Sequence, residues 1–112
     1  MIRNITKKTV ISQKESHLIT GLQKAKGLMF SIKPKTLIFH FEVSQKILLH
    51  MLFVFFSIDL ILLDKNKKVI ELKENFFPFT FYKSKKKCKY LIELKKGSIK
   101  KSKTKLNDII RF

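Results

Sequence analysis

Apolar residues fall into short runs along the chain, and polar, lysine-rich segments separate these runs. Most runs either alternate between apolar and polar positions or are apolar on both faces, which is typical of β-strands. We therefore predict a single domain, residues 1–112, that is mainly β (α+β). It should be a small bent-sheet or barrel-like domain of short, mostly antiparallel strands. The predicted strands are residues 9–12, 37–41, 47–56, 58–63, 69–73, 88–94 and 109–112.

The longest apolar stretch, residues 47–63, raises the question of a membrane span. Its 17 residues reach only the lower limit for crossing a bilayer core. Asp59 would lie in hydrocarbon at a cost of about 2.5–3.5 kcal/mol. We predict instead two strands with a bend at residues 57–59, the first of them apolar on both faces and central in a sheet. A turn at residues 64–67 follows, with Asn66 in the left-handed conformation, and no membrane span is predicted.

Smaller signals predict the remaining elements. Thr20 and Gln23 fit a capping box and Gly27 fits a helix stop, which predicts one short helix at about residues 21–26 in the N-terminal half of the chain. Pro78 indicates an edge strand or a bulge after residue 73. Gly97 and the serine after it begin a brief helical turn. The alternation of residues 88–94 directs Lys89 and Glu93 outward and the following residues inward: Cys88, Tyr90, Ile92 and Leu94.

Several of these residues, taken in chain order, resemble the domain of unknown function 192 family (DUF192), an uncharacterised protein family. They are Thr20, Ala25-Lys26-Gly27-Leu28-Met29-Phe30, Ile58-Asp59, Asp64, Tyr90-Leu91-Ile92-Glu93-Leu94, Gly97 and Asp108. The resemblance runs from about residue 5 to the end of the sequence, and the Gly-Leu-Met-Phe block is its most specific part. It implies a compact, mostly β domain with a short helix near the start, and it implies no activity.

The chain departs from the family pattern at the predicted central strand. Many relatives carry Met-Lys-Asn on that strand and a proline just before the Ile/Leu-Asp pair. Here Met51 is followed by Leu52 and Phe53, and Ser57 stands in the place of the proline. A role that rests on that lysine and asparagine therefore does not carry over, and Asp59 is the polar position that remains.

Asp59 and His50 are the ionisable groups inside the apolar stretch, and together they form a candidate polar site. A carboxylate at a strand bend most often accepts backbone N–H groups, and a histidine on an apolar strand is most often a hydrogen-bonded core residue. The alternative is a functional acid or ligand. His40 and His50 share a face if their strands pair symmetrically, but two histidines without a third ligand do not predict a metal. We predict no metal and no cofactor.

Charge adds the strongest functional signal. The net charge is +17, and all but two of the 25 basic residues are lysines. Residues 83–105 hold 11 lysines and one acid, and such a segment binds polyanions, nucleic acid above all. The candidate contacts are Lys85, Lys86, Lys87, Lys100, Lys101 and Lys103. Phe79, Phe81 and Tyr82 would stack on bases if they are exposed. The alternative is a solvated lysine-rich surface of the kind that heat-adapted proteins carry.

Cysteine content and the first residues bear on the cellular setting. Cys88 is the only cysteine, so no intramolecular disulfide can form, and its place in the alternation makes it a small buried hydrophobe. MIRNITKKTVISQKES holds no apolar core of a signal peptide, so a cytoplasmic location is predicted. No phosphate-binding glycine loop, zinc-protease or nucleophile-elbow motif is present. We therefore predict a non-enzymatic binding or interaction module, and the alternative is an enzyme or small-ligand binder with a pocket near Asp59 and His50.

Overall fold

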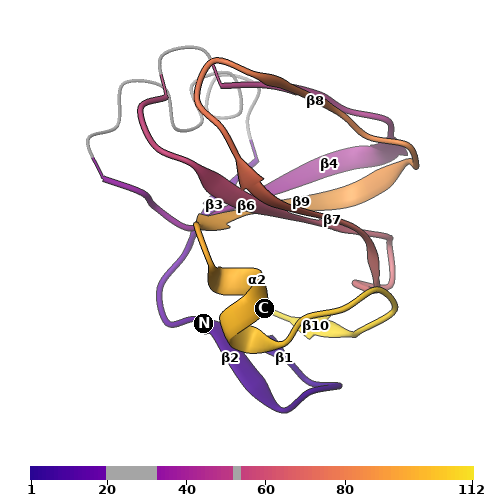
Figure 1. The fold of residues 1–112 in the computed structure, drawn as a ribbon. Helices are drawn as coiled ribbons and strands as arrows, with labels where there is room; N and C mark the ends of the chain where they lie inside the picture. The colour runs from indigo at the N-terminus through magenta and orange to yellow at the C-terminus, as the bar shows by residue number, and fades with distance from the viewer. Residues whose placement is uncertain (20–32, 52–53) are drawn as a thin grey trace.

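The computed structural model describes residues 1–19, 33–51 and 54–112. The described strands form three sheets (Figure 1). The largest has the order β3-β4-β9-β6-β7, with strands Ser16–Leu18, Leu37–Gln45, Cys88–Lys95, Ile58–Leu63 and Val69–Phe76. A second sheet has the order β10-β1-β2, with strands Ile110–Arg111, Ile2–Asn4 and Thr9–Ser12. The third is a ribbon of two strands, β5 (Leu48–His50) and β8 (Phe81–Lys83). Helix α2 spans Ser98–Ser102.

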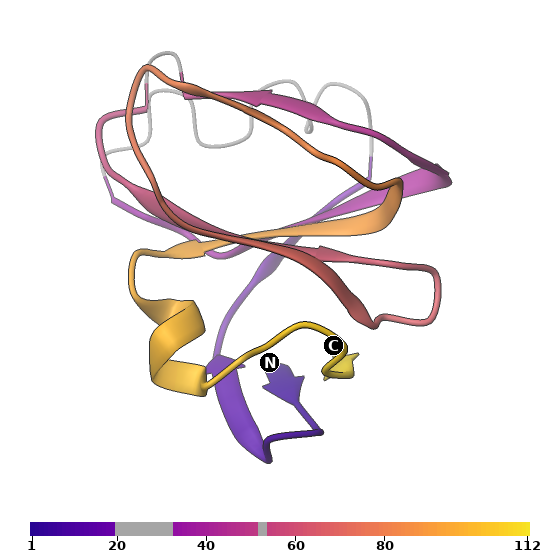
Figure 2. The same cartoon turned by 45° about the vertical axis from the view of Figure 1, so that its right-hand side comes forward.

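The five-stranded sheet is the middle layer of the molecule. The β5·β8 ribbon lies over one of its faces, and α2 with the three-stranded sheet lies against the other (Figures 1 and 2). Each face has its own core, because β6 and β9 direct alternate side chains to opposite sides. Leu60, Leu62 and Leu91 pack under the ribbon. Ile61 and Ile92 pack against the α2 side.

The mainly β class is confirmed. The prediction was wrong about which strand is buried on both faces. The described residues of this stretch do not form a central strand: among residues 47–51 and 54–56 only Leu48–His50 are in a strand, and its described pairing is with β8. Met51 and Val54 are buried without lying in a strand. All six residues of β6 are buried instead, because β7 and β9 flank it and both of its faces are covered.

The other local predictions have mixed outcomes. Strand β4 continues to Gln45, beyond the predicted end at residue 41. In the turn after β6 the left-handed residue is Lys67, with φ 61°, and not Asn66. Strand β7 reaches Phe76, so that Pro78 comes after it in a turn. Gly97 precedes α2 as expected. The predicted helix at 21–26 lies outside the described residues.

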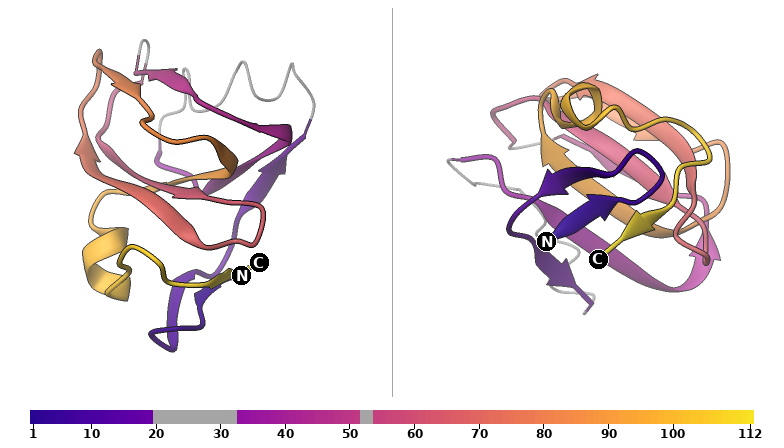
Figure 3. Two further views of the ribbon diagram at one scale, coloured as in Figure 1. Left: turned by 90° about the vertical axis from the view of Figure 1, so that its right-hand side faces the viewer. Right: turned by 90° about the horizontal axis from the view of Figure 1, so that it is seen from below.

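The two ends of the described chain meet below the five-stranded sheet (Figure 3). Strand β1 pairs antiparallel with β10, so that Arg3 lies opposite Arg111. The Asp108 carboxylate is 3% exposed and holds this corner together. It accepts hydrogen bonds from Asn4 Nδ2 at 2.8 Å, from Lys7 Nζ at 2.8 Å and from the backbone N–H of Lys105 at 2.9 Å. Burial acts to raise the pKa of Asp108, but these hydrogen bonds and the lysine charge lower it below its usual value.

Candidate functional site

Asp59 lies on β6, where the pairing of β6 with β7 shifts register. Its side chain is buried, and both carboxylate oxygens accept backbone hydrogen bonds. Oδ1 accepts the N–H of Asn75 at 3.0 Å, while Oδ2 accepts those of Gly97 at 3.1 Å and Ile99 at 3.0 Å. The carboxylate therefore ties β6 to the end of β7 and to the start of α2. Both of its oxygens thus accept hydrogen bonds that hold the fold together.

The structure does not place His50 as a core residue. His50 lies in β5 opposite Phe81 and is exposed. Nor does His40 share a sheet with His50, because His40 lies on β4 opposite Tyr90. The Nε2 of His40 is instead 2.7 Å from Nδ1 of His17, which the parallel pairing of β3 with β4 brings alongside. No sequence signal joined these two histidines.

Cys88 is buried at the start of β9, as predicted. Burial and then the nearby Glu71 carboxylate raise the pKa of the Cys88 thiol to about 11. The same carboxylate accepts the Tyr82 hydroxyl, and burial together with this hydrogen bond raises the pKa of Tyr82. A thiol with such a pKa is neutral at physiological pH, and the neutral form is a poor nucleophile.

We expect Cys88 to resist thiol reagents in the folded protein. Both the burial of its sulfur and the raised pKa of its thiol should slow the reaction with a disulfide reagent at pH 7.5 by at least about a hundredfold relative to the unfolded chain. The release of the coloured thiolate with and without denaturant measures this ratio. Similar rates in the two states would show that the sulfur is accessible.

The candidate lysines fall into two groups. Lys85, Lys86 and Lys87 precede β9, whereas the helical lysines follow it, so the whole eight-residue strand, about 23 Å long, lies between the two groups in the chain. The N–H groups of Lys85 and Lys86 donate to the buried Glu71 carboxylate, at 2.7 and 2.5 Å, which fixes that loop while its lysine side chains stay exposed. Lys100 and Lys103 line a hollow of about 260 Å³ together with Glu74. Lys101 faces elsewhere.

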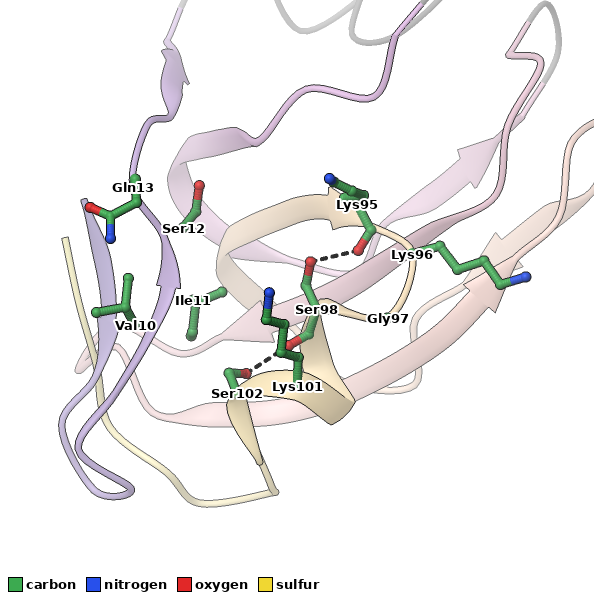
Figure 4. A pocket seen from close by; sticks show the side chains of 10 residues that line it. All are labelled: Val10, Ile11, Ser12, Gln13, Lys95, Lys96, Gly97, Ser98, Lys101 and Ser102. Atoms are coloured by element: carbon green, nitrogen blue, oxygen red, sulfur yellow. Dashed lines mark hydrogen bonds between the residues drawn. The ribbon is translucent and has the colours of Figure 1, made fainter.

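Lys101 lines a larger cleft between β2 and α2 (Figure 4). The cleft has a volume of about 770 Å³. Lys95 and Lys96, at the end of β9, join Lys101 there, and β2 supplies an apolar wall through Val10 and Ile11. Hydroxyl and amide side chains and one glycine complete the lining: Ser12, Gln13, Gly97, Ser98 and Ser102. None of the lining residues is acidic. The sequence did not indicate this cleft, because it depends on how α2 packs against β2.

The three aromatic residues named from the sequence separate into two environments. Phe79 and Phe81 are 55% and 65% exposed. Tyr82 is partly buried and points toward the core beneath the ribbon. Within the described residues, no group of three or more histidine, cysteine or acidic side chains is arranged to hold a metal ion. Across the same residues, no helix has the length and apolar character that a membrane crossing requires.

Comparison with known proteins follows from this geometry. A family model for DUF192, described as "Uncharacterized ACR", matches residues 8–112 and confirms the resemblance noted in the sequence. Similar folds occur in a candidate transcription regulator from Sinorhizobium meliloti 1021 and in a protein of unknown function from Novosphingobium aromaticivorans DSM 12444. Each has a TM-score of 0.81 and 19% sequence identity; the first match covers 87% of this chain and 79% of the other, the second 88% and 74%. At this identity the likeness concerns the fold alone. No curated protein matches the chain.

Proposed function

The chain belongs to the uncharacterised DUF192 family, so we propose a function from its own surface. The protein is a non-enzymatic binding module whose basic surface contacts a polyanion, and the proposed polyanion is a nucleic acid. The observation that carries the proposal is the cleft between β2 and α2. Lys95, Lys96 and Lys101 line it, although the Lys96 side chain points away from β2 (Figure 4), and no carboxylate lines it. Such a hollow concentrates positive potential and attracts phosphate groups.

The lysine content of the site fits phosphate contact better than base recognition. Lysine carries a point charge on a flexible side chain. Arginine has a planar guanidinium that makes bidentate hydrogen bonds to guanine edges and to phosphates. The cleft holds no arginine, and Arg3 and Arg111 lie together in the β1·β10 pair. The proposed contact is therefore to the backbone of the polyanion, with affinity that depends steeply on salt.

The alternative of a catalytic or ligand pocket near Asp59 and His50 finds less support. Both oxygens of Asp59 are engaged by backbone N–H groups that hold β7 and α2 in place. His50 lies on a different sheet and is exposed. The pair therefore does not form a common acid–base arrangement with a pocket between its members.

Replacing Lys95, Lys96 and Lys101 with glutamine tests the proposal. We expect the melting temperature to stay nearly unchanged, since exposed charges contribute little to the fold. Affinity for a fluorescent DNA duplex should fall at low salt. The log–log salt slope should shrink by roughly 0.9 for each phosphate that the variant no longer neutralises, up to about 2.7 for the triple variant. Fluorescence anisotropy across a salt series measures both quantities.

The matched control replaces three exposed lysines near the opposite end of β9 from the cleft, Lys46, Lys65 and Lys68, with glutamine. Lys7 is unsuitable as a control, because its Nζ pairs with the buried Asp108. A further triple at Lys85, Lys86 and Lys87 measures the other basic group. Equal losses of affinity in the cleft and control triples would reduce the effect to net charge and refute a site. Absence of wild-type binding at physiological salt would refute the proposal as a whole.

A further inference from the structure

The outer face of the β5·β8 ribbon carries aromatic side chains that are more than half exposed. In an antiparallel pair, residues directly opposite one another point to the same face. Leu49 lies opposite Tyr82, and both pack toward the core. Phe81, the neighbour of Tyr82, therefore points outward, and its 65% exposure agrees with this direction.

Further exposed rings lie beyond the N-terminal end of β8. The ribbon's hydrogen bonds extend beyond the strand, because Met51 N donates to Thr80 O and Phe79 N donates to Met51 O, both at 2.9 Å. Phe79, two residues before Phe81, is 55% exposed. Phe55 is 62% exposed and lies edge-on to Phe79, with ring centroids 6.0 Å apart. We call Phe81, Phe79 and Phe55 the aromatic face.

Positive charge begins where the aromatic face ends. Lys83 lies opposite Leu48 at the last pair of the ribbon, on the same outer side as Phe81. The chain then leads into Lys85, Lys86 and Lys87, whose backbone is fixed by Glu71. Phe79, Phe81 and these lysines therefore follow one another along β8 and the segments that flank it, on backbone that hydrogen bonds hold in place.

We propose that the aromatic face stacks the bases of single-stranded nucleic acid while Lys83 and the 85–87 lysines contact its phosphates. This inference rests on the proposed function and names the class of polyanion. Exposed aromatic rings beside cations bind single strands with little sequence preference, since every base offers a π-face. In a duplex the bases are stacked on one another, so no base face is free to stack on the aromatic rings. Rings that lead into lysines fit a single strand whose bases lie over the rings and whose phosphates continue past the lysines.

The test uses the full chain and a short fluorescent oligothymidylate. Two double variants are compared: Phe55→Leu with Phe81→Leu, and Phe55→Tyr with Phe81→Tyr. Leucine keeps the apolar character and removes the π-face, whereas tyrosine keeps the ring. We expect the leucine pair to weaken single-strand binding by about tenfold for each base that no longer stacks, and the tyrosine pair to bind as the wild type does. Leu106→Ala removes an exposed apolar side chain elsewhere and should change nothing.

Parallel measurements separate the possible failures. Duplex affinity should be the same for the wild type and for the leucine pair. If lysine substitutions weaken binding but the leucine pair does not, the aromatic inference is overturned while the proposed function stands. If the wild type binds neither oligonucleotide, duplex nor heparin at physiological salt, both fall. Tighter binding to phosphatidylserine vesicles than to the oligonucleotide, retained by the leucine pair, would identify a lipid surface as the partner and overturn the inference.

Discussion

Asp59→Leu is expected to lower the free energy of unfolding by about 3–5 kcal/mol. The substitution removes the acceptor of three backbone N–H groups. A buried donor left without a partner, here that of Ile99, costs about 1–3 kcal/mol, and the two partly buried donors cost about 1 kcal/mol each. Asn75, Gly97 and Ile99 supply these donors from two different elements. The loss should therefore loosen the end of β7 and the start of α2 together, which urea denaturation and amide exchange would both register.

Asp59→Asn is the matched variant. Its single amide oxygen can take the place of Oδ2 and keep the hydrogen bonds from Gly97 and Ile99, at the expense of the one from Asn75. We expect roughly half the loss of stability seen with leucine. Equal stability of the asparagine and leucine variants would contradict a structural role for the carboxylate and would return attention to a functional one.

Glu93→Gln is expected to abolish a large pH dependence of stability. Glu93 is 7% exposed on β9, and its Oε1 has no hydrogen-bond partner within the described part of the chain. Burial raises the pKa of Glu93 to about 8. The unfolded chain releases this proton near pH 4.5, whereas the folded protein keeps it until about pH 8. Folding therefore becomes less favourable as the pH rises between these values.

This group alone should remove on the order of 4 kcal/mol of stability between pH 4.5 and 8, and no more above that range. Denaturation of the wild type and of Glu93→Gln in urea at several pH values measures the difference, which should grow through this window and favour glutamine. Glu93→Leu, which also removes the unpaired polar atoms, should be at least as stable as Glu93→Gln at pH 8. Parallel pH profiles for the wild type and Glu93→Gln would show that the carboxyl has access to water.

Glu93 also shows where sequence patterns stop predicting the fold. The strand at 88–94 was found from its alternation, and the glutamate was assigned to the outside as the polar member. β9 is paired on both edges, and its two faces carry Leu91 and Ile92 into separate cores. A charged residue in the middle of such a strand, as Glu93 is, is buried whichever way it points. The alternation located the strand without revealing that both faces are covered.

The central strand was missed for a related reason. Residues 47–56 and 58–63 are both continuous apolar runs, and the period alone does not show which run other strands will flank. Pairing partners decide this: β6 has two, and β5 has one. The hairpin of strands 58–63 and 69–73 was predicted more accurately, because a polar turn separates the two apolar runs, although its second strand extends to Phe76. Local chemistry is readable in sequence, whereas long-range pairing is less so.

The candidate site was likewise predictable from the sequence only in part. A charge run is visible in sequence, and the run at 83–105 marked the lysines of two surfaces. That β9 would carry them to opposite ends, and that Lys95 and Lys96 would join Lys101 beside β2, required the fold. The contact between His17 and His40 likewise needs the parallel pairing of β3 with β4. Polyanion contact itself stays a prediction.

The pairing of β1 with β10 has a consequence for how the protein is made. Asn4 bonds to Asp108, and the N–H of Ile5 bonds to the carbonyl of Ile109, so residues more than 100 positions apart complete one corner. A nascent chain emerging from the ribosome holds β1 long before its partner strand exists. The apolar residues that face β1 and α2, such as Ile61 and Ile92, then stay uncovered until residues 98–111 have been synthesised. A domain that needs β10 to pair with β1 leaves this apolar surface exposed to aggregation until β10 has been synthesised.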